Sequence, residues 1–211
     1  MIAIVNYGVG NLFSLESSFR KIGYDVNVTS DANEILCASR IILPGVGAFG
    51  DAAEKLFASG LDVPLKNAAF GKKVPLLGIC VGMQLLFDRS FEFGEHVGLG
   101  FIPGSVRAIS EVLPKDSGLK IPQIGWNALI INQDQAHDPL LKNIPDGSHV
   151  YFVHSYAAFC ERKYVSSEVE YGALLTASVR RENIFGVQFH PEKSGEVGLQ
   201  ILRNFCEMGV V

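Results

Sequence analysis

The strongest chemical signal in the sequence is a cysteine between two glycines. Residues 78–82 read Gly-Ile-Cys-Val-Gly and follow the apolar run 74–79. A strand that leads into Gly-x-Cys-x-Gly and then into a helix is the cysteine counterpart of the nucleophile elbow of hydrolases. So tight a turn needs small residues two positions before and after the nucleophile, here Gly78 and Gly82. The pattern predicts that Cys80 is a nucleophile lifted clear of a sheet.

The predicted helix over residues 80–87 gives this cysteine its chemistry. A helix dipole and free backbone amides favour a thiolate over a thiol. We also expect the amide of Val81 to point toward the place where an oxyanion would form. The alternative is that Cys80 is a buried packing residue, because most free cysteines are small hydrophobic side chains.

A second chemical motif stands near the C-terminus, where residues 186–192 read Gly-Val-Gln-Phe-His-Pro-Glu. Pro191 stops strand pairing and holds His190 in an extended conformation. Residues two apart on an extended backbone point the same way, so His190 and Glu192 are predicted to project to one side. A carboxylate there can fix the imidazole tautomer and stabilise its protonated form. Alone, the motif would favour a solvated turn, but an elbow cysteine needs a histidine from elsewhere in the chain.

The remaining histidines and cysteines carry weaker signals. His96, His137 and His149 lie in polar or loop-like contexts, and we expect no chemical role for them. The four cysteines are scattered, with no Cys-x-x-Cys pair, so neither disulfides nor a metal site is expected; they are Cys37, Cys80, Cys160 and Cys206.

Composition indicates a globular protein. The chain has 211 residues, of which 48% are hydrophobic and 19% charged, and this fits one domain over residues 1–211 with a substantial core. A net charge of −4 gives no reason to expect a nucleic acid or an anionic membrane as partner. The short apolar N-terminus lacks a basic segment, and every apolar run is interrupted, so we expect a cytoplasmic protein without a membrane span.

The first half of the chain alternates β-rich runs with amphipathic stretches, which is typical of parallel strands joined by helices. Strands are expected at 2–6, 25–29, 40–43 and 74–79, and helices at 12–22, 51–58, 63–70 and 80–87. This pattern predicts a three-layer α/β fold of flavodoxin-like type, in which helices flank a central, mostly parallel sheet.

The second half is dominated by strands with short turns, which predicts antiparallel strands that extend or flank the sheet. These strands are expected at 102–109, 128–132, 148–156, 172–179 and 184–189, before a helix over 195–208.

Two segments carry a resemblance to a known family. Residues 78–84, Gly-Ile-Cys-Val-Gly-Met-Gln, and 188–195, Gln-Phe-His-Pro-Glu-Lys-Ser-Gly, resemble the class I (triad) glutamine amidotransferases. Within that family the chain is similar, over nearly its whole length, to the glutaminase subunits of imidazole glycerol phosphate synthases. Segments 6–12, 44–49, 125–127 and 151–156 narrow the resemblance, although Asn6 stands where an aspartate is more usual. The resemblance implies the class I glutamine amidotransferase fold.

The resemblance also implies roles for individual residues. Cys80 would be the nucleophile, His190 the general base and acid, and Glu192 the residue that orients the imidazole. An oxyanion hole would be formed by Val46, Gly47 and Val81, and glutamine would be bound by Gly45, Gln84, Glu92, Ser155 and Tyr156. Each binding residue has the alternative of being an ordinary solvated side chain, and the glycine-rich loop 44–47 could be an ordinary strand-to-helix turn.

The implied reaction releases ammonia from L-glutamine through a thioester, without a metal or organic cofactor. The family further implies a heterodimer with a (β/α)8-barrel cyclase subunit that consumes the ammonia in histidine biosynthesis. Residues matching motifs at that interface are Asn11, Trp126, Tyr151 and Lys193. Trp126 could instead belong to the core.

Three other functions stay open at this stage. The chain could serve another synthase, for pyridoxal phosphate, anthranilate or a surface sugar, although the loop 45–47 and the segment 193–195 argue against the first two. It could be a cysteine peptidase or thiol hydrolase of similar fold. It could also be a binding module that has kept the fold without the activity.

Overall fold

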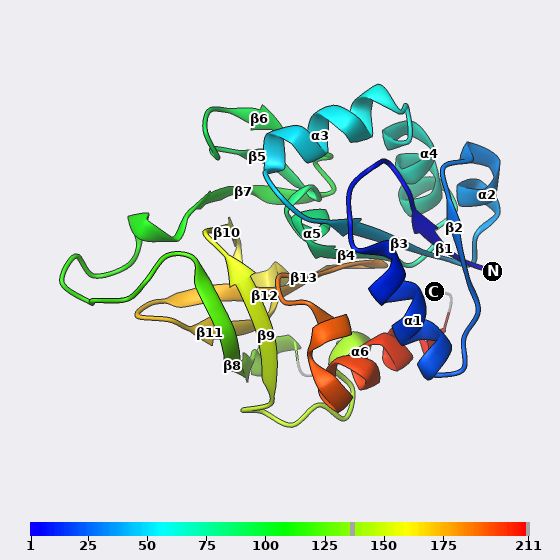
Figure 1. The fold of residues 1–211 in the computed structure, drawn as a ribbon. Coiled ribbons are helices and arrows are strands. Elements are labelled where there is room, and N and C mark those ends of the chain that lie inside the picture. The colour runs from blue at the N-terminus through cyan, green and yellow to red at the C-terminus, as the bar shows by residue number, and fades with distance from the viewer. Residues whose placement is uncertain (136–137, 210–211) are drawn as a thin grey trace.

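The computed structural model, which describes residues 1–135 and 138–209, is built on a nine-stranded mixed sheet (Figure 1). The strand order is β2-β1-β3-β4-β13-β12-β11-β8-β9. Neighbouring strands are parallel in the first half, which comprises β1 (Ile2–Val5), β2 (Val26–Thr29), β3 (Arg40–Gly45), β4 (Leu76–Cys80) and β13 (Ile184–Val187). They are antiparallel from β13 onward, through β12 (Leu174–Arg181), β11 (Val165–Glu170), β8 (Gln123–Ile131) and β9 (His149–His154). The predicted α/β class is confirmed, and the antiparallel strands extend the same sheet.

Helices cover both faces of the parallel half. Figure 1 shows α1 and α6 together on one face and α3 and α4 on the other. The helices are α1 (Leu12–Lys21), α2 (Ala32–Cys37), α3 (Phe49–Ala58), α4 (Asp62–Lys66), the π-helical turn η1 (Asn67–Gly71), α5 (Val81–Gln84) and α6 (Gly195–Glu207). Five 3-10 turns complete the set: η2 (Ile109–Glu111), η3 (Gln133–Gln135), η4 (Pro139–Leu141), η5 (Arg162–Tyr164) and η6 (Pro191–Lys193). Because both faces are covered, all five residues of β4 are buried, as its continuous apolar run predicted.

A second, four-stranded sheet lies beside the first, with the order β10-β7-β5-β6. It consists of β10 (Tyr156–Cys160), β7 (Ile102–Ala108), β5 (Phe87–Ser90) and β6 (His96–Val97). The expected strand 148–156 is therefore divided: the chain leaves the large sheet after His154 and enters the small one at Tyr156. This break matters for function because it places residues 154–156 at the junction of the two sheets.

The helix expected over residues 80–87 is wrong in its length. It ends at Gln84, and the chain continues into β5. The backbone after this helix forms hydrogen bonds with a different segment, since the carbonyl of Leu86 accepts from the amides of Phe101 (2.7 Å) and Ile102 (2.9 Å). Pairing with a segment 15 residues away thus replaces the local helix, and apolar periodicity alone does not reveal such pairing. Among the described residues, no helix is long and apolar enough to cross a bilayer.

Candidate active site

The carboxyl ends of three parallel strands meet at one place. Gly45 at the end of β3 lies opposite Cys80 at the end of β4, and Val187 at the end of β13 lies opposite Ile79. The loop after β3, the turn after β4 and the segment after β13 are consequently neighbours. The oxyanion loop, the nucleophile and the catalytic histidine were predicted from the sequence to lie in these three segments. Ligands bind at this edge of open α/β sheets.

Cys80 occupies a strained elbow. Its backbone has φ 55° and ψ −114°, a conformation that residues other than glycine rarely adopt, and its side chain is buried. A Cβ on Gly82 would lie 1.9 Å from the carbonyl oxygen of Leu43, and one on Gly78 would lie 2.6 Å from the carbonyl oxygen of Gly82. The predicted need for small residues on both sides of the nucleophile is confirmed. The turn is held by the close packing of β3 against α5.

The shortness of α5 limits how far a helix dipole can stabilise a thiolate at Cys80. A helix of four residues has a much smaller dipole than the eight-residue helix that we expected. What the elbow does supply is the amide of Val81, which lies in the first turn and has no intrahelical acceptor. The local donors and the neighbouring imidazole therefore matter more here than the helix dipole.

His190 is fixed by a dense set of hydrogen bonds. Its Nδ1 lies 2.8 Å from Oε1 of Glu192, and both side chains are almost fully buried. Its amide donates to the carbonyl of Tyr151 (2.9 Å), while the hydroxyl of Ser194 donates to its carbonyl (2.6 Å). His190 is extended, as predicted, but Glu192 lies in the 3-10 turn η6. The expectation that both share an extended backbone is therefore wrong, and it is the turn that brings the carboxylate to Nδ1.

The electrostatics of this histidine depend on its two partners. Burial lowers the pKa of His190, but its hydrogen bonds to the Cys80 sulfur and to Glu192 outweigh burial and raise the pKa to about 10. An imidazolium between a sulfur and a carboxylate is thus favoured at neutral pH. Oε2 of Glu192 is buried and makes no hydrogen bond within the described residues, so the charge beside it is its main compensation. Cys80, His190 and Glu192 meet in space.

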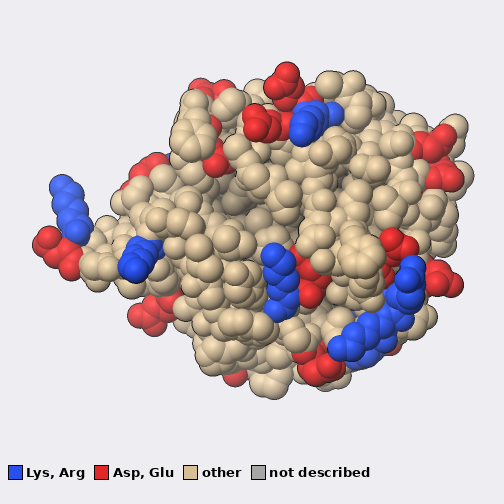
Figure 2. Space-filling model, viewed as in Figure 1, with Lys and Arg blue, Asp and Glu red and all other residues tan. Residues whose placement is uncertain are grey.

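A cavity of about 380 Å³ opens over the Cys80 sulfur. Most of the predicted site residues line it: Val46, Gly47, Cys80, Val81, Gln84, Glu92, Ser155, Tyr156, His190 and Lys193. Three further lining residues, Pro122, Val153 and His154, were not among the predicted site residues. Gly45 is not in the lining; it lies beneath the elbow, where a Cβ would come within 2.4 Å of the amide of Gly82. Figure 2 shows a hollow near the centre of the face in view, with Lys and Arg side chains on several sides of it.

Two polar side chains in the cavity already have partners. Oε2 of Glu92 accepts a hydrogen bond from the amide of Phe49 (2.7 Å), at the start of α3, and burial raises the pKa of this carboxyl group. Nε2 of Gln84 donates to the carbonyl of Tyr156 (3.1 Å) and to Oε1 of Gln188 (2.9 Å). Both N–H groups of Gln84 are therefore used within the protein, which leaves its oxygen for a ligand.

Gln188 is a side chain beside the nucleophile to which the sequence analysis gave no role. Its side chain is fully buried, and its Nε2 lies 3.7 Å from the Cys80 sulfur as a donor. The feature of the sequence that could have pointed to Gln188 is its position two residues before His190. Phe189 between them turns the other way and packs edge-on against Phe152, with ring centroids 5.8 Å apart.

Three of the four residues assigned to a partner interface lie together, on strands β8 and β9 and in η6. Trp126 is paired with Tyr151 across the two strands, their ring centroids are 6.1 Å apart, and Nζ of Lys193 lies 5.7 Å from the Tyr151 ring. Trp126 is 52% exposed, so the alternative that it belongs to the core is wrong. Asn11 begins α1, where its side-chain oxygen accepts a hydrogen bond from the amide of Ser14 (3.4 Å).

The other cysteines do not share the environment of Cys80. Burial raises the pKa of the Cys160 and Cys206 thiols to about 12, and Cys37 is exposed. Within residues 1–135 and 138–209, no group of three or more His, Cys, Asp and Glu side chains is arranged to hold a metal ion.

The remaining histidines differ in their surroundings. His96 is half-buried beside Phe49, with ring centroids 6.5 Å apart, and His149 is exposed. His137 lies outside the described residues. His154 is buried, and this burial lowers its pKa to about 4, so its imidazole is neutral at pH 7.

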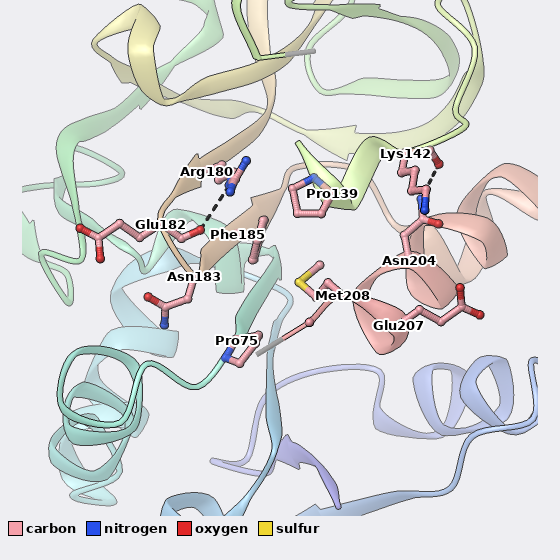
Figure 3. Close-up of a pocket in the computed structure, with 11 residues that line it drawn as sticks. Pro75, Pro139, Lys142, Arg180, Glu182, Asn183, Phe185, Asn204, Glu207 and Met208 are labelled. Atoms are coloured by element: carbon pink, nitrogen blue, oxygen red, sulfur yellow. Dashed lines mark hydrogen bonds between the residues drawn. The ribbon is translucent and has the colours of Figure 1, made fainter. Parts of the chain in front are cut away.

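Another cavity, of about 400 Å³, lies at the opposite end of β4 and is shown in Figure 3. It begins at Pro75, just before the strand, and its polar groups already bond to one another. Nε of Arg180 donates to the carbonyl of Glu182 (3.2 Å), and Nδ2 of Asn204 donates to the carbonyl of Lys142 (2.7 Å) (Figure 3). Among the described residues, no cysteine, serine or histidine lines this cavity. Its described lining therefore offers no nucleophile and base like those at the carboxyl ends of the strands.

Comparisons with known proteins agree with this geometry. The family model described as "Glutamine amidotransferase class-I" matches residues 3–208. The chain is 46% identical over 216 residues to "Imidazole glycerol phosphate synthase subunit HisH" of Wolinella succinogenes, covering 99% of this chain and 100% of that protein. It is 48% identical over 209 residues to the protein of the same name from Caldanaerobacter subterraneus subsp. tengcongensis, covering 99% of this chain and 98% of that protein.

Solved structures share the fold at lower sequence identity. One described as "Crystal structure of glutamine amidotransferase" has a TM-score of 0.74 at 15% identity and covers 98% of both chains. "Structure of PurLQS from Thermotoga maritima" has a TM-score of 0.70 at 20% identity and covers 97% of this chain and 96% of that one. The chain belongs to the class-I glutamine amidotransferase family and, within it, to the group of imidazole glycerol phosphate synthase HisH subunits.

Proposed function

We propose that this chain hydrolyses L-glutamine to glutamate and ammonia through a thioester on Cys80. The observation that carries the proposal is the meeting of a strained elbow cysteine and a buried imidazole in the wall of one cavity, with a carboxylate 2.8 Å from that imidazole. In this proposal Cys80 is the nucleophile, His190 the general acid and base, and Glu192 the group that orients it.

The first half of the reaction forms the thioester. The Cys80 sulfur attacks the side-chain amide carbon of glutamine, and the carbonyl oxygen becomes an oxyanion. The amide of Val81 and amides of the loop at Val46 and Gly47 stabilise that oxyanion. His190, protonated by virtue of its raised pKa, then gives its Nε2 proton to the departing nitrogen as the C–N bond breaks. Ammonia leaves and the acyl group stays on sulfur.

The second half returns the enzyme to its starting state. His190, now neutral, takes a proton from water as the water oxygen attacks the thioester carbon. The C–S bond breaks, glutamate leaves, and the sulfur is again paired with a protonated imidazole. Glu192 accepts the hydrogen bond from Nδ1 in both halves of the reaction, so the ring keeps its orientation while Nε2 loses and regains its proton.

Selectivity for glutamine follows from the charges of its amino-acid head group. The free oxygen of the Glu92 carboxylate is suited to the α-ammonium group, and the segment at Ser155 and Tyr156 is suited to the α-carboxylate. The oxygen of Gln84, whose N–H groups are engaged, can accept a hydrogen bond from the substrate. Gly45 contributes indirectly, because its lack of a side chain lets β3 approach the elbow.

We further propose a (β/α)8-barrel cyclase as the partner that consumes the ammonia. The relatives at 46–48% identity are named as subunits of imidazole glycerol phosphate synthase, and this name implies a second subunit. The exposed Trp126, its neighbour Tyr151, and Lys193 form the surface offered to that subunit, and Asn11, at the N-cap of α1, is the fourth residue that we assign to it. We place the pair in the cytoplasm, where the reactive thiol stays reduced, and in histidine biosynthesis.

A glutaminase assay titrated with the barrel subunit and its nucleotide substrate tests the proposal. We expect glutamate release to rise with added partner and to fall by about three or more orders of magnitude in Cys80→Ala. Cys37→Ala is the matched control, because Cys37 is exposed and is not among the residues that line the cavity, and it should retain the wild-type rate. Equal rates in wild type and Cys80→Ala would refute the catalytic assignment.

A glutamine-analogue electrophile separates the remaining alternatives. Labelling of Cys80 that glutamine prevents favours a glutaminase over a peptidase of similar fold. A chain that is never labelled at Cys80, with or without the partner, would be a binding module. Replacing the barrel subunit with other synthases determines which ammonia acceptor the chain serves.

A further inference from the structure

A buried side-chain amide lies against the nucleophile, two residues before the imidazole in the segment that connects β13 to η6. Gln188 follows β13, its side chain has no solvent exposure, and its Nε2 lies 3.7 Å from the Cys80 sulfur. Its backbone amide donates to the carbonyl of Ala177 (2.8 Å), which ties the residue to β12. The side chain thus approaches the sulfur from a segment that this hydrogen bond anchors to the sheet.

The neighbouring hydrogen bonds fix which end of this amide faces the sulfur. A carbonyl oxygen can only accept, so the bond to the carbonyl of Tyr156 requires the nitrogen of Gln84 at that position. The same nitrogen then directs its second hydrogen at Gln188, which must present its oxygen to receive it (2.9 Å). The N–H2 group of Gln188 is therefore left facing Cys80, and this orientation follows from the hydrogen-bond network.

We infer that Gln188 is a positioning residue that holds the Cys80 sulfur as a thiolate and connects it to the glutamine-binding wall. This inference rests on the proposed function and deepens it. An N–H group buried beside sulfur is satisfied far better by a thiolate than by a thiol, because a charged acceptor makes the stronger hydrogen bond. The imidazole of His190 and the amide of Gln188 then stabilise the same anion.

The network also reaches the substrate cavity. It runs from the carbonyl of Tyr156 through the amides of Gln84 and Gln188 to the sulfur, and both Tyr156 and Gln84 line the cavity. A ligand that bonds to the free oxygen of Gln84 would polarise its N–H groups and, through them, the amide of Gln188. The reactivity of the nucleophile would in this way respond to an occupied cavity.

The pH dependence of Cys80 alkylation tests the inference. Iodoacetamide is used as the probe, and peptide mass spectrometry follows modification of Cys80 separately from the other thiols. In Gln188→Met, which keeps the length of the side chain but has no donor, we expect the alkylation rate at pH 7 to fall about tenfold and the profile to move to higher pH. With glutamine as substrate, kcat should fall by a similar factor while KM changes less than about twofold.

Two further variants keep the test decisive. Gln188→Glu has the shape of glutamine but no N–H group when ionised, so it should shift the profile in the same direction, even if Gln188→Met fails to fold. Gln200→Met, on α6, makes the same change of side chain away from the site and should leave the alkylation profile unaltered.

An unchanged alkylation profile in a folded Gln188 variant would overturn the inference. A role in packing alone would lower the thermal stability and leave the profile where it is. Alkylation needs no turnover, so a shifted profile in a protein without glutaminase activity would leave the inference standing and refute the proposed function instead.

Discussion

The stability of the fold should depend on pH through one buried histidine. His154 lies in the wall of the cavity, with Nδ1 2.8 Å from the carbonyl of Tyr156 and Nε2 2.9 Å from the side-chain oxygen of Gln123. Burial is the main cause that lowers its pKa to about 4, and the charge of nearby His190 lowers it further. An unfolded chain would protonate the same histidine at about pH 6.5.

The sign of the effect follows from proton binding. Between about pH 4 and 6.5 the unfolded chain binds the proton and the folded one does not, so stability is fully present above that range and is lost as the pH falls. At pH 5 the two pKa values correspond to a loss of about 2 kcal/mol in the free energy of unfolding, compared with almost none at pH 7.5.

The measurement compares the wild type with His154→Asn. Asparagine can keep a donor near the Nδ1 position but does not titrate. Urea unfolding followed by far-UV circular dichroism gives the free energy of unfolding of both proteins at pH 7.5 and 5. Other titrating groups are common to both, so the wild type should lose about 2 kcal/mol more than the variant on acidification. Equal losses in the two proteins would refute the reasoning.

Three other residues, when replaced, should change either the free energy of unfolding or the KM for glutamine. Gly82→Ala would place a Cβ 1.9 Å from the carbonyl oxygen of Leu43, so we expect a loss of about 3 kcal/mol or more in the free energy of unfolding, checked by urea denaturation. Burial raises the pKa of Glu92, and a protonated carboxyl cannot pair with an α-ammonium group. The KM for glutamine should therefore rise as the pH is lowered in wild type, and Glu92→Gln should have a high KM without this dependence in steady-state kinetics. Tyr7→Phe removes a 2.7 Å hydrogen bond to the carbonyl of Pro44, beside the oxyanion loop, and should lower the unfolding free energy by about 1 kcal/mol on urea denaturation.

Much of the parallel half of the fold could be predicted from sequence, because its strands are short apolar runs ended by strong local signals. The start of β1 at Ile2, the helix at Leu12 and the strand that ends at Cys80 were all expected within a residue or two. The helix Ala32–Cys37 and the strand Val165–Glu170 were not. The strand has buried serines where an apolar pattern was sought, and Ser167 bonds to Ser178 on the neighbouring strand at 2.6 Å.

Of the second sheet, the sequence predicted β7, as the strand 102–109, but not β5 or β6, and it placed β10 at the end of a longer strand. These other strands are short, with four, two and five residues, and they are stabilised by partners far away along the chain, as in the pairing of Tyr156 with Ala108. Propensity and periodicity are local measures, whereas such strands form because tertiary pairing satisfies their backbone groups. The division of the expected strand 148–156 at Ser155 has the same origin.

For this protein, sequence alone determined the chemistry that each motif can perform. A cysteine between glycines and a histidine before proline restrict the backbone within a few residues, and φ and ψ limits are local. Only the tertiary structure decided that β4 and β13 lie side by side, which brings Gln188 and His190 to a sulfur more than a hundred residues earlier in the chain. It also decided that a 3-10 turn, rather than an extended strand, delivers the carboxylate of Glu192. Contacts of that kind arise from the packing of whole elements, which no short segment encodes.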